Sequence, residues 1–132
     1  MLKPAHEMGG APQFRQELET WVARLLTPEW EVVFVADDTI TDRAQVRACI
    51  DQREATITCN PARQVRPGGD ACHEVVHILL RRMHDVASRI IDQLPEALRQ
   101  FARDTWGEAH EEVTEEVARA FMRAYGAPAE EG

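Results

Sequence analysis

Residues 70–94 read DACHEVVHILLRRMHDVASRIIDQL, and this stretch decides how the rest of the chain is interpreted. Apolar residues recur in it at the three- and four-residue spacing of an amphipathic helix. Asp70 is a suitable N-cap residue, and the Pro67-Gly68-Gly69 segment before it is typical of a loop. The pattern therefore predicts one long helix that follows a turn and carries the pentapeptide HEVVH in its first half.

The pentapeptide His73-Glu74-Val75-Val76-His77 places two histidines four residues apart, so that on a helix both imidazoles project from one face. This spacing allows both rings to bind one zinc ion at about 2.0–2.1 Å. Glu74 points to the side of that face, where it can accept the proton of a zinc-activated water without binding the metal. The sequence therefore predicts one zinc ion per chain, with Glu74 as the catalytic general base. The alternative is a pair of ordinary surface or core histidines.

The segments upstream of this helix predict one more helix and a small sheet. A helix of about 14 residues begins at Pro12, where apolar residues follow helical spacing. Three later segments are rich in β-branched and aromatic residues or alternate polar with apolar ones, and they are residues 30–35, 45–50 and 55–59. The polar break at 51–54 fits a hairpin loop. We therefore expect an α+β fold: an N-terminal helix, a small three-stranded mostly antiparallel sheet, then the HExxH helix and C-terminal helices.

The length of 132 residues fits a single domain. Residues 1–11 lack periodicity and are expected to form a disordered arm. The folded domain is expected to span residues 12–126, with Pro95 opening a further helix, Gly107 interrupting it, and the tail 127–132 frayed.

Composition excludes several classes of function. The net charge is −8 and no basic stripe occurs, so a nucleic-acid partner is not expected. No apolar run approaches the roughly 20 residues of a membrane span, and the N-terminus lacks a signal-peptide core, so a cytoplasmic location without membrane contact is expected. The three cysteines are odd in number and form no CxxC pair, which argues against a disulfide framework or a zinc ribbon. The oligomeric state is left open.

The HEVVH segment after a strand resembles the zincin metallopeptidases. The metzincin extension is absent, because Leu80 and Met83 stand where that branch has Gly and His. The gluzincin branch takes its third ligand from a glutamate on a later helix, in the pattern Asn-Glu-x-x-Ser-Asp, and residues 110–118, HEEVTEEVA, are similar. As a whole, residues 12–125 look like the minimal HExxH proteins encoded in bacterial and phage genomes, in which a helix and a three-stranded sheet precede the motif helix.

The resemblance implies that Glu111 is the third zinc ligand and that Glu115 takes the place of the Asp that supports a zinc-bound histidine. Helical periodicity alone leaves Glu111 and Glu116 open as ligands, because each lies at an edge of the apolar face. His110 departs from the Asn of the pattern, and it is open as a ligand, as a transition-state donor or supporting group, or as a packed core histidine.

The preferred function is hydrolysis of a peptide bond in a peptide or protein substrate by zinc-activated water. An electrophilic donor is expected near the zinc, and His110, His84 and Tyr125 are its candidates. The segment Ala55–Cys59 is a candidate edge strand along which an extended peptide pairs. The alternatives are a zinc-binding sensor and a non-catalytic α+β interaction module.

Overall fold

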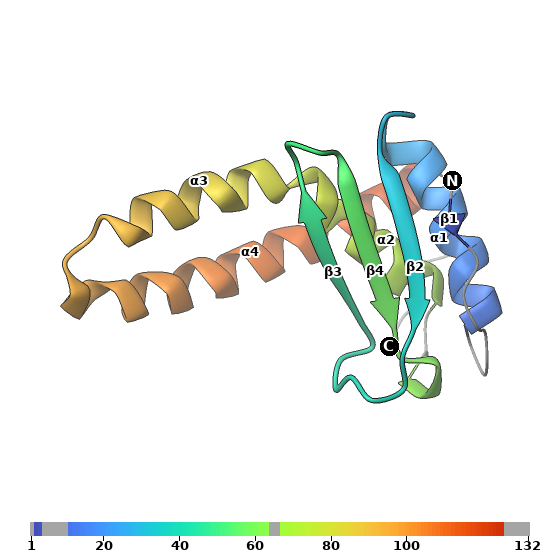
Figure 1. The fold of residues 1–132 in the computed structure, drawn as a ribbon, viewed down its shortest axis with the longest axis horizontal. Helices are drawn as coiled ribbons and strands as arrows, with labels where there is room; N and C mark the ends of the chain where they lie inside the picture. The colour runs from blue at the N-terminus through green and yellow to red at the C-terminus, as the bar shows by residue number, and fades with distance from the viewer. Residues whose placement is uncertain (1, 4–10, 64–66, 126–132) are drawn as a thin grey trace.

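The computed structural model describes residues 2–3, 11–63 and 67–125. The predicted α+β architecture is confirmed (Figure 1). In chain order the elements are β1 (Leu2–Lys3), α1 (Ala11–Leu25), β2 (Glu31–Ala36), β3 (Ala44–Cys49), β4 (Glu54–Cys59), the 3-10 turn η1 (Pro61–Arg63), α2 (Pro67–Leu79), α3 (Arg81–Asp92) and α4 (Glu96–Ala124).

The sheet has the strand order β1-β2-β4-β3 and is mixed. The hairpin expected at 51–54 is present, since β3 and β4 pair antiparallel. However, β2 pairs parallel with β4, with Phe34 opposite Ile57, so the sheet is not mostly antiparallel. This follows from the hairpin docking on β2 through its second strand, which makes β4 central and leaves β3 at the edge. The expectation that Ala55–Cys59 is an edge strand is therefore wrong.

The N-terminal residues differ from the expected arm in one respect. Leu2–Lys3 form the short strand β1, which pairs parallel with β2, so the expectation of disorder is wrong for these two residues. Helix α1 begins at Ala11, one residue earlier than expected. The rest of the predicted arm, residues 4–10, and the predicted frayed tail, 127–132, lie outside the described residues.

The core lies between the sheet and helices α1, α2 and α4. Alternation along the two strands buries Val32 and Phe34 in β2 and Ala55, Ile57 and Cys59 in β4, and these side chains meet apolar residues of the helices. The largest fully buried ones are Trp21, Phe14, Phe34, Leu18, Ile57, Ile78, Val32, Val75 and Val76. The buried half of α2 therefore anchors the HEVVH segment against the sheet, which fixes where its other face points.

The helical half of the chain is divided differently from the expectation. The long helix predicted from Asp70 is two helices, α2 and α3, which meet at Leu80. Conversely, Gly107 does not interrupt α4, which is one helix of 29 residues. A side chain at Gly107 would meet nothing within 4 Å, so this glycine faces open space and costs only its intrinsic helix propensity of about 1 kcal/mol. Helices α3 and α4 form a hairpin that projects away from the sheet (Figure 1).

No helix within the described ranges combines the length and the apolar character that a bilayer crossing needs.

Candidate metal centre

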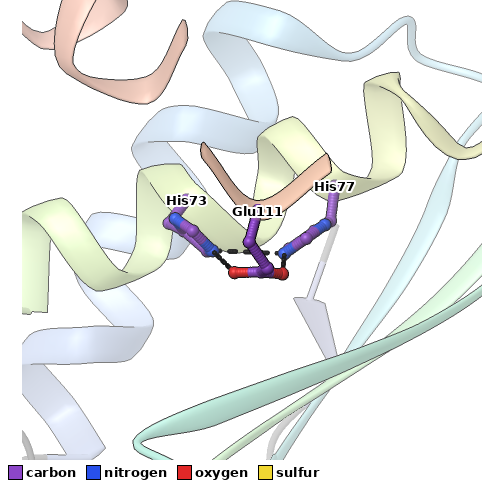
Figure 2. A group of neighbouring side chains, drawn as sticks. All are labelled: His73, His77 and Glu111. Atoms are coloured by element: carbon purple, nitrogen blue, oxygen red, sulfur yellow. Dashed lines mark hydrogen bonds and ion pairs between the residues drawn. The ribbon is translucent and has the colours of Figure 1, made fainter. Parts of the chain in front are cut away.

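Helices α2 and α4 pack side by side, and their contact brings three ligand-type side chains together (Figure 2). His73 and His77 project from α2 one turn apart, and Glu111 reaches them from α4. The Nε2 atoms of the two histidines are 3.1 Å apart. The Glu111 carboxylate oxygens lie 3.4 Å from His73 Nε2 and 3.0 Å from His77 Nε2.

These three spacings fit a zinc ion. Ligand atoms about 2.0–2.1 Å from a tetrahedral zinc are separated from one another by about 3.3 Å, close to the distances between the three side chains. The set of two histidines and one glutamate is also a donor set of catalytic zinc sites, which keep a fourth position open. Glu111 is 61% exposed and lines a cleft, so the site is open on this side.

Each histidine is held by a second contact at its other ring nitrogen. His73 Nδ1 lies 2.9 Å from the Glu115 carboxylate, and His77 Nδ1 lies 3.2 Å from His110 Nε2. Such contacts fix the ring orientation and direct Nε2 toward the shared point. The backbone of His110 is tied in turn by Thr114, whose hydroxyl donates to the His110 carbonyl at 2.7 Å.

Glu74 is a buried carboxyl group that lines the same cleft, and it is 8% exposed. Burial raises the pKa of Glu74 to about 8, with further upward contributions from the charges of Glu111, Asp70 and Asp42. Burial and then the neighbouring His73 lower the pKa of His77 to about 4. His77 is therefore neutral near pH 7, which is the form in which histidine binds a metal.

The cleft beside the site has a volume of about 790 Å³. One wall is the edge strand β3, and the other is formed by α2, the start of α3 and α4. Arginines line it as well, at Arg43, Arg81, Arg119 and Arg123. Arg119 contacts Glu115 at 3.2 Å and Arg81 contacts Asp85 at 2.9 Å. The cleft is therefore open, polar and flanked by a sheet edge.

A second cluster extends the site along the cleft. Trp106 Nε1 donates to His84 Nδ1 at 3.0 Å, so a neutral His84 carries its proton on Nε2. The Trp106 ring stacks on His110 with centroids 5.4 Å apart, and His84 and His110 lie within 5.3 Å of each other. Trp106 is not among the site residues that the sequence predicted. The signal was available in its spacing, because Trp106 and His110 are one helical turn apart on the face that meets α3.

The structure brings together most of the residues that the sequence singled out. His73, Glu74, His77, Glu111 and Glu115 line one cleft, together with His84 and His110. Glu116, the alternative third ligand, is not part of the three-residue group.

Tyr125 does not belong to the site, and its expected role near the zinc is wrong. Its ring packs edge-on against Trp21 with centroids 5.5 Å apart, and the Arg24 guanidinium lies 4.6 Å from its centroid. It comes 14 residues after Glu111, which is about 21 Å along the helix axis.

Comparisons with protein-family models, with curated proteins and with solved structures gave no match. The interpretation of the site therefore rests on its own geometry.

Proposed function

We propose that this chain is a zinc-dependent metallopeptidase with His73, His77 and Glu111 as metal ligands and Glu74 as the general base. The observation that supports this most is the spacing of the three ligand atoms, which come from two different helices and lie 3.0–3.4 Å apart. Two histidines on a partly buried helix face are costly unless their polar atoms are satisfied, and a shared zinc ion satisfies both.

Each residue of the chain has a defined task in this proposal. When bound, zinc supplies a Lewis acid that polarises the scissile carbonyl and lowers the pKa of water. Because the bound dication would favour its ionised form, Glu74 can accept the proton of the attacking water and deliver it to the leaving amine. His84 is the donor that suits the developing oxyanion best, because its contact with Trp106 directs an N–H from Nε2. His110 is less suitable, since its Nε2 already contacts His77.

The proposed substrate path follows β3 in place of the segment Ala55–Cys59. In the sheet β3 pairs with β4 on one side only, and Ala44, Gln45, Val46 and Ala48 line the cleft. An extended peptide that adds to this edge gains backbone hydrogen bonds and passes in front of the metal ligands. The substrate class is therefore a peptide or an unfolded segment of a protein.

The test combines metal content with turnover. Protein prepared in zinc-replete medium is expected to contain about one zinc ion per chain, measured by elemental analysis. On a quenched-fluorescent peptide library the wild type is expected to cleave at least one sequence. Glu74→Gln is expected to retain the metal and lose turnover, because an amide cannot accept the proton of water. Glu116→Gln removes an exposed carboxylate outside the ligand group and serves as the matched control.

The outcomes separate the proposed peptidase from its alternatives. A zinc content near zero, with no uptake on titration, would exclude the metal site and leave an interaction module. Stoichiometric zinc without turnover of any peptide would leave a zinc-binding sensor. Turnover that persists in Glu74→Gln would show that another group is the base.

A further inference from the structure

The hairpin formed by α3 and the first half of α4 exposes a continuous apolar stripe. Ile90 is 59% exposed and Phe101 is 72% exposed. We define the apolar hairpin face as Met83, Val86, Ile90, Leu98 and Phe101, all of which are at least 46% exposed. None of these side chains lines the cleft. Exposed apolar patches of this kind mark interaction sites more often than scattered single residues do.

Helix geometry places all five residues on one side of the hairpin. The inner side of α3 is marked by the buried Ile91, and that of α4 by Trp106, which bonds to His84 across the hairpin. At 100° per residue, both apolar stripes lie about 110° round their helices from these inner sides, in the same rotational sense. Because the two helices run antiparallel, rotation in the same direction about each helix axis puts both stripes on the same face of the hairpin. The Arg103–Asp92 ion pair lies on the other face.

The charges at the margins of this face indicate its occupant. The outer edge of α3 carries Arg82 and Arg89, and the outer edge of α4 carries Asp104 and Glu108, all four exposed. A second copy of the hairpin that lays its α4 on α3 brings each basic edge against an acidic one. Residues 81–109 hold five basic and five acidic residues, whereas the whole chain has a net charge of −8. Two copies that approach through this segment therefore avoid the repulsion that their net charge would otherwise cause.

We propose that the apolar hairpin face is a self-association surface, on which two copies of this chain form an isologous four-helix contact. The area of the apolar hairpin face determines how strongly the two copies associate. Two helices about 18 Å long and about 10 Å wide present a face of roughly 350 Å² per copy, which belongs to the small, transient class of interfaces. The dimer is therefore weak and reversible. This inference does not depend on the proposed peptidase activity.

The first test is sedimentation velocity of the full chain from about 5 to 500 µM, a range that brackets weak association. The mass is expected to rise with concentration from 15.0 kDa toward twice that value. Phe101→Glu is expected to weaken association at least tenfold, because it places charge on the apolar face. Gln13→Glu adds the same charge at an exposed position on α1, outside the hairpin, and is expected to associate like the wild type.

A charge exchange tests the arrangement of the two copies. The double variant Arg82→Glu, Arg89→Glu is expected to stay monomeric over the same range. Adding Asp104→Arg and Glu108→Arg to it exchanges the two edges and is expected to restore association. Circular dichroism and zinc content per chain are expected to stay unchanged in every variant. A failure of the self-association proposal is therefore distinguishable from a failure of the metal site. A wild-type chain that remains monomeric at 500 µM, or a quadruple variant that does not recover, would overturn the proposal.

Discussion

The buried carboxyl group of Glu74 makes the metal-free protein sensitive to pH in a direction that can be worked out. Burial raises its pKa in the folded state from 4.5 to about 8. Between these values the folded state holds a proton that the unfolded state releases, so stability is full below pH 4.5 and is lost as the pH rises toward 8. Integrated from pH 5 to pH 8, the resulting loss in the free energy of unfolding amounts to roughly 3 kcal/mol. Glu74→Gln carries no titratable proton and lacks this contribution.

The assay is urea unfolding of wild type and Glu74→Gln in the presence of a chelator at several pH values from 5 to 8. Comparing the two proteins cancels other titrating groups, including His77, whose lowered pKa acts in the opposite direction between about pH 4 and 6.5. The wild type is expected to lose roughly 3 kcal/mol relative to the variant over this range. With zinc present the difference is expected to shrink, because a nearby dication favours the ionised carboxylate. If the stabilities of wild type and Glu74→Gln change in parallel with pH in the presence of the chelator, Glu74 does not hold a proton in the folded state.

The remaining predictions concern the third ligand and the groups that support the histidines. Glu111→Ala is expected to weaken zinc binding far more than Glu112→Ala, measured by competition with a chromophoric chelator, because only Glu111 touches both histidines; equal losses would mean that another residue is the ligand. Glu115→Ala is expected to cost about 10–100-fold in zinc affinity through loss of its contact with His73, an intermediate effect in the same assay. His110→Ala is expected to fall in that intermediate range as well, and complete loss of zinc would instead make it a ligand.

The histidine face of α2 was predictable because the spacing of its two histidines is local. Two histidines four residues apart share a helix face wherever the helix packs, and the apolar residues between them indicated which side is buried. The break at Leu80 was not predictable in the same way. The helical hydrogen bonds continue across it, with Leu80 N–H bonded to Val76 and His84 N–H bonded to Leu80. The apolar pattern therefore shows no interruption where the axis changes.

In the sheet, the sequence pattern predicted where the strands lie but not how they pair. Alternation located β2, β3 and β4 within a residue or two, because it depends only on which side chains are buried. The parallel pairing of β2 with β4 depends on how a finished hairpin docks on an earlier strand, which is a contact between distant segments. The error matters for the proposed function, because it placed the candidate peptide-binding edge on β4, whereas β3 is the edge strand that borders the cleft.

Helix α4 shows why hydrophobicity alone misplaced a buried face. Val113 belongs to the apolar periodicity of α4, yet Val113 is 46% exposed and Thr114 is fully buried. A threonine can occupy this place because its hydroxyl donates to the His110 carbonyl and leaves only its methyl group to be packed. The true buried line runs through Thr114, Ala118 and Met122, and small residues in it let α4 approach α2 closely. The resemblance to the gluzincin pattern singled out Glu111, which lies beside both histidines, whereas apolar periodicity left Glu111 and Glu116 open.

The two proposed surfaces are compatible because they lie on different sides of the hairpin. Arg81 and His84 line the cleft, whereas Val86 and Ile90 lie about 140° and 180° round the helix from Arg81. Association through the apolar hairpin face would therefore cover a different side of α3 from the one that lines the cleft. The same long helix would carry Glu111 and Phe101, ten residues or about 15 Å apart along its axis. Packing a partner on the hairpin would stabilise the part of α4 that precedes the ligand, and with it the position of Trp106 against His84.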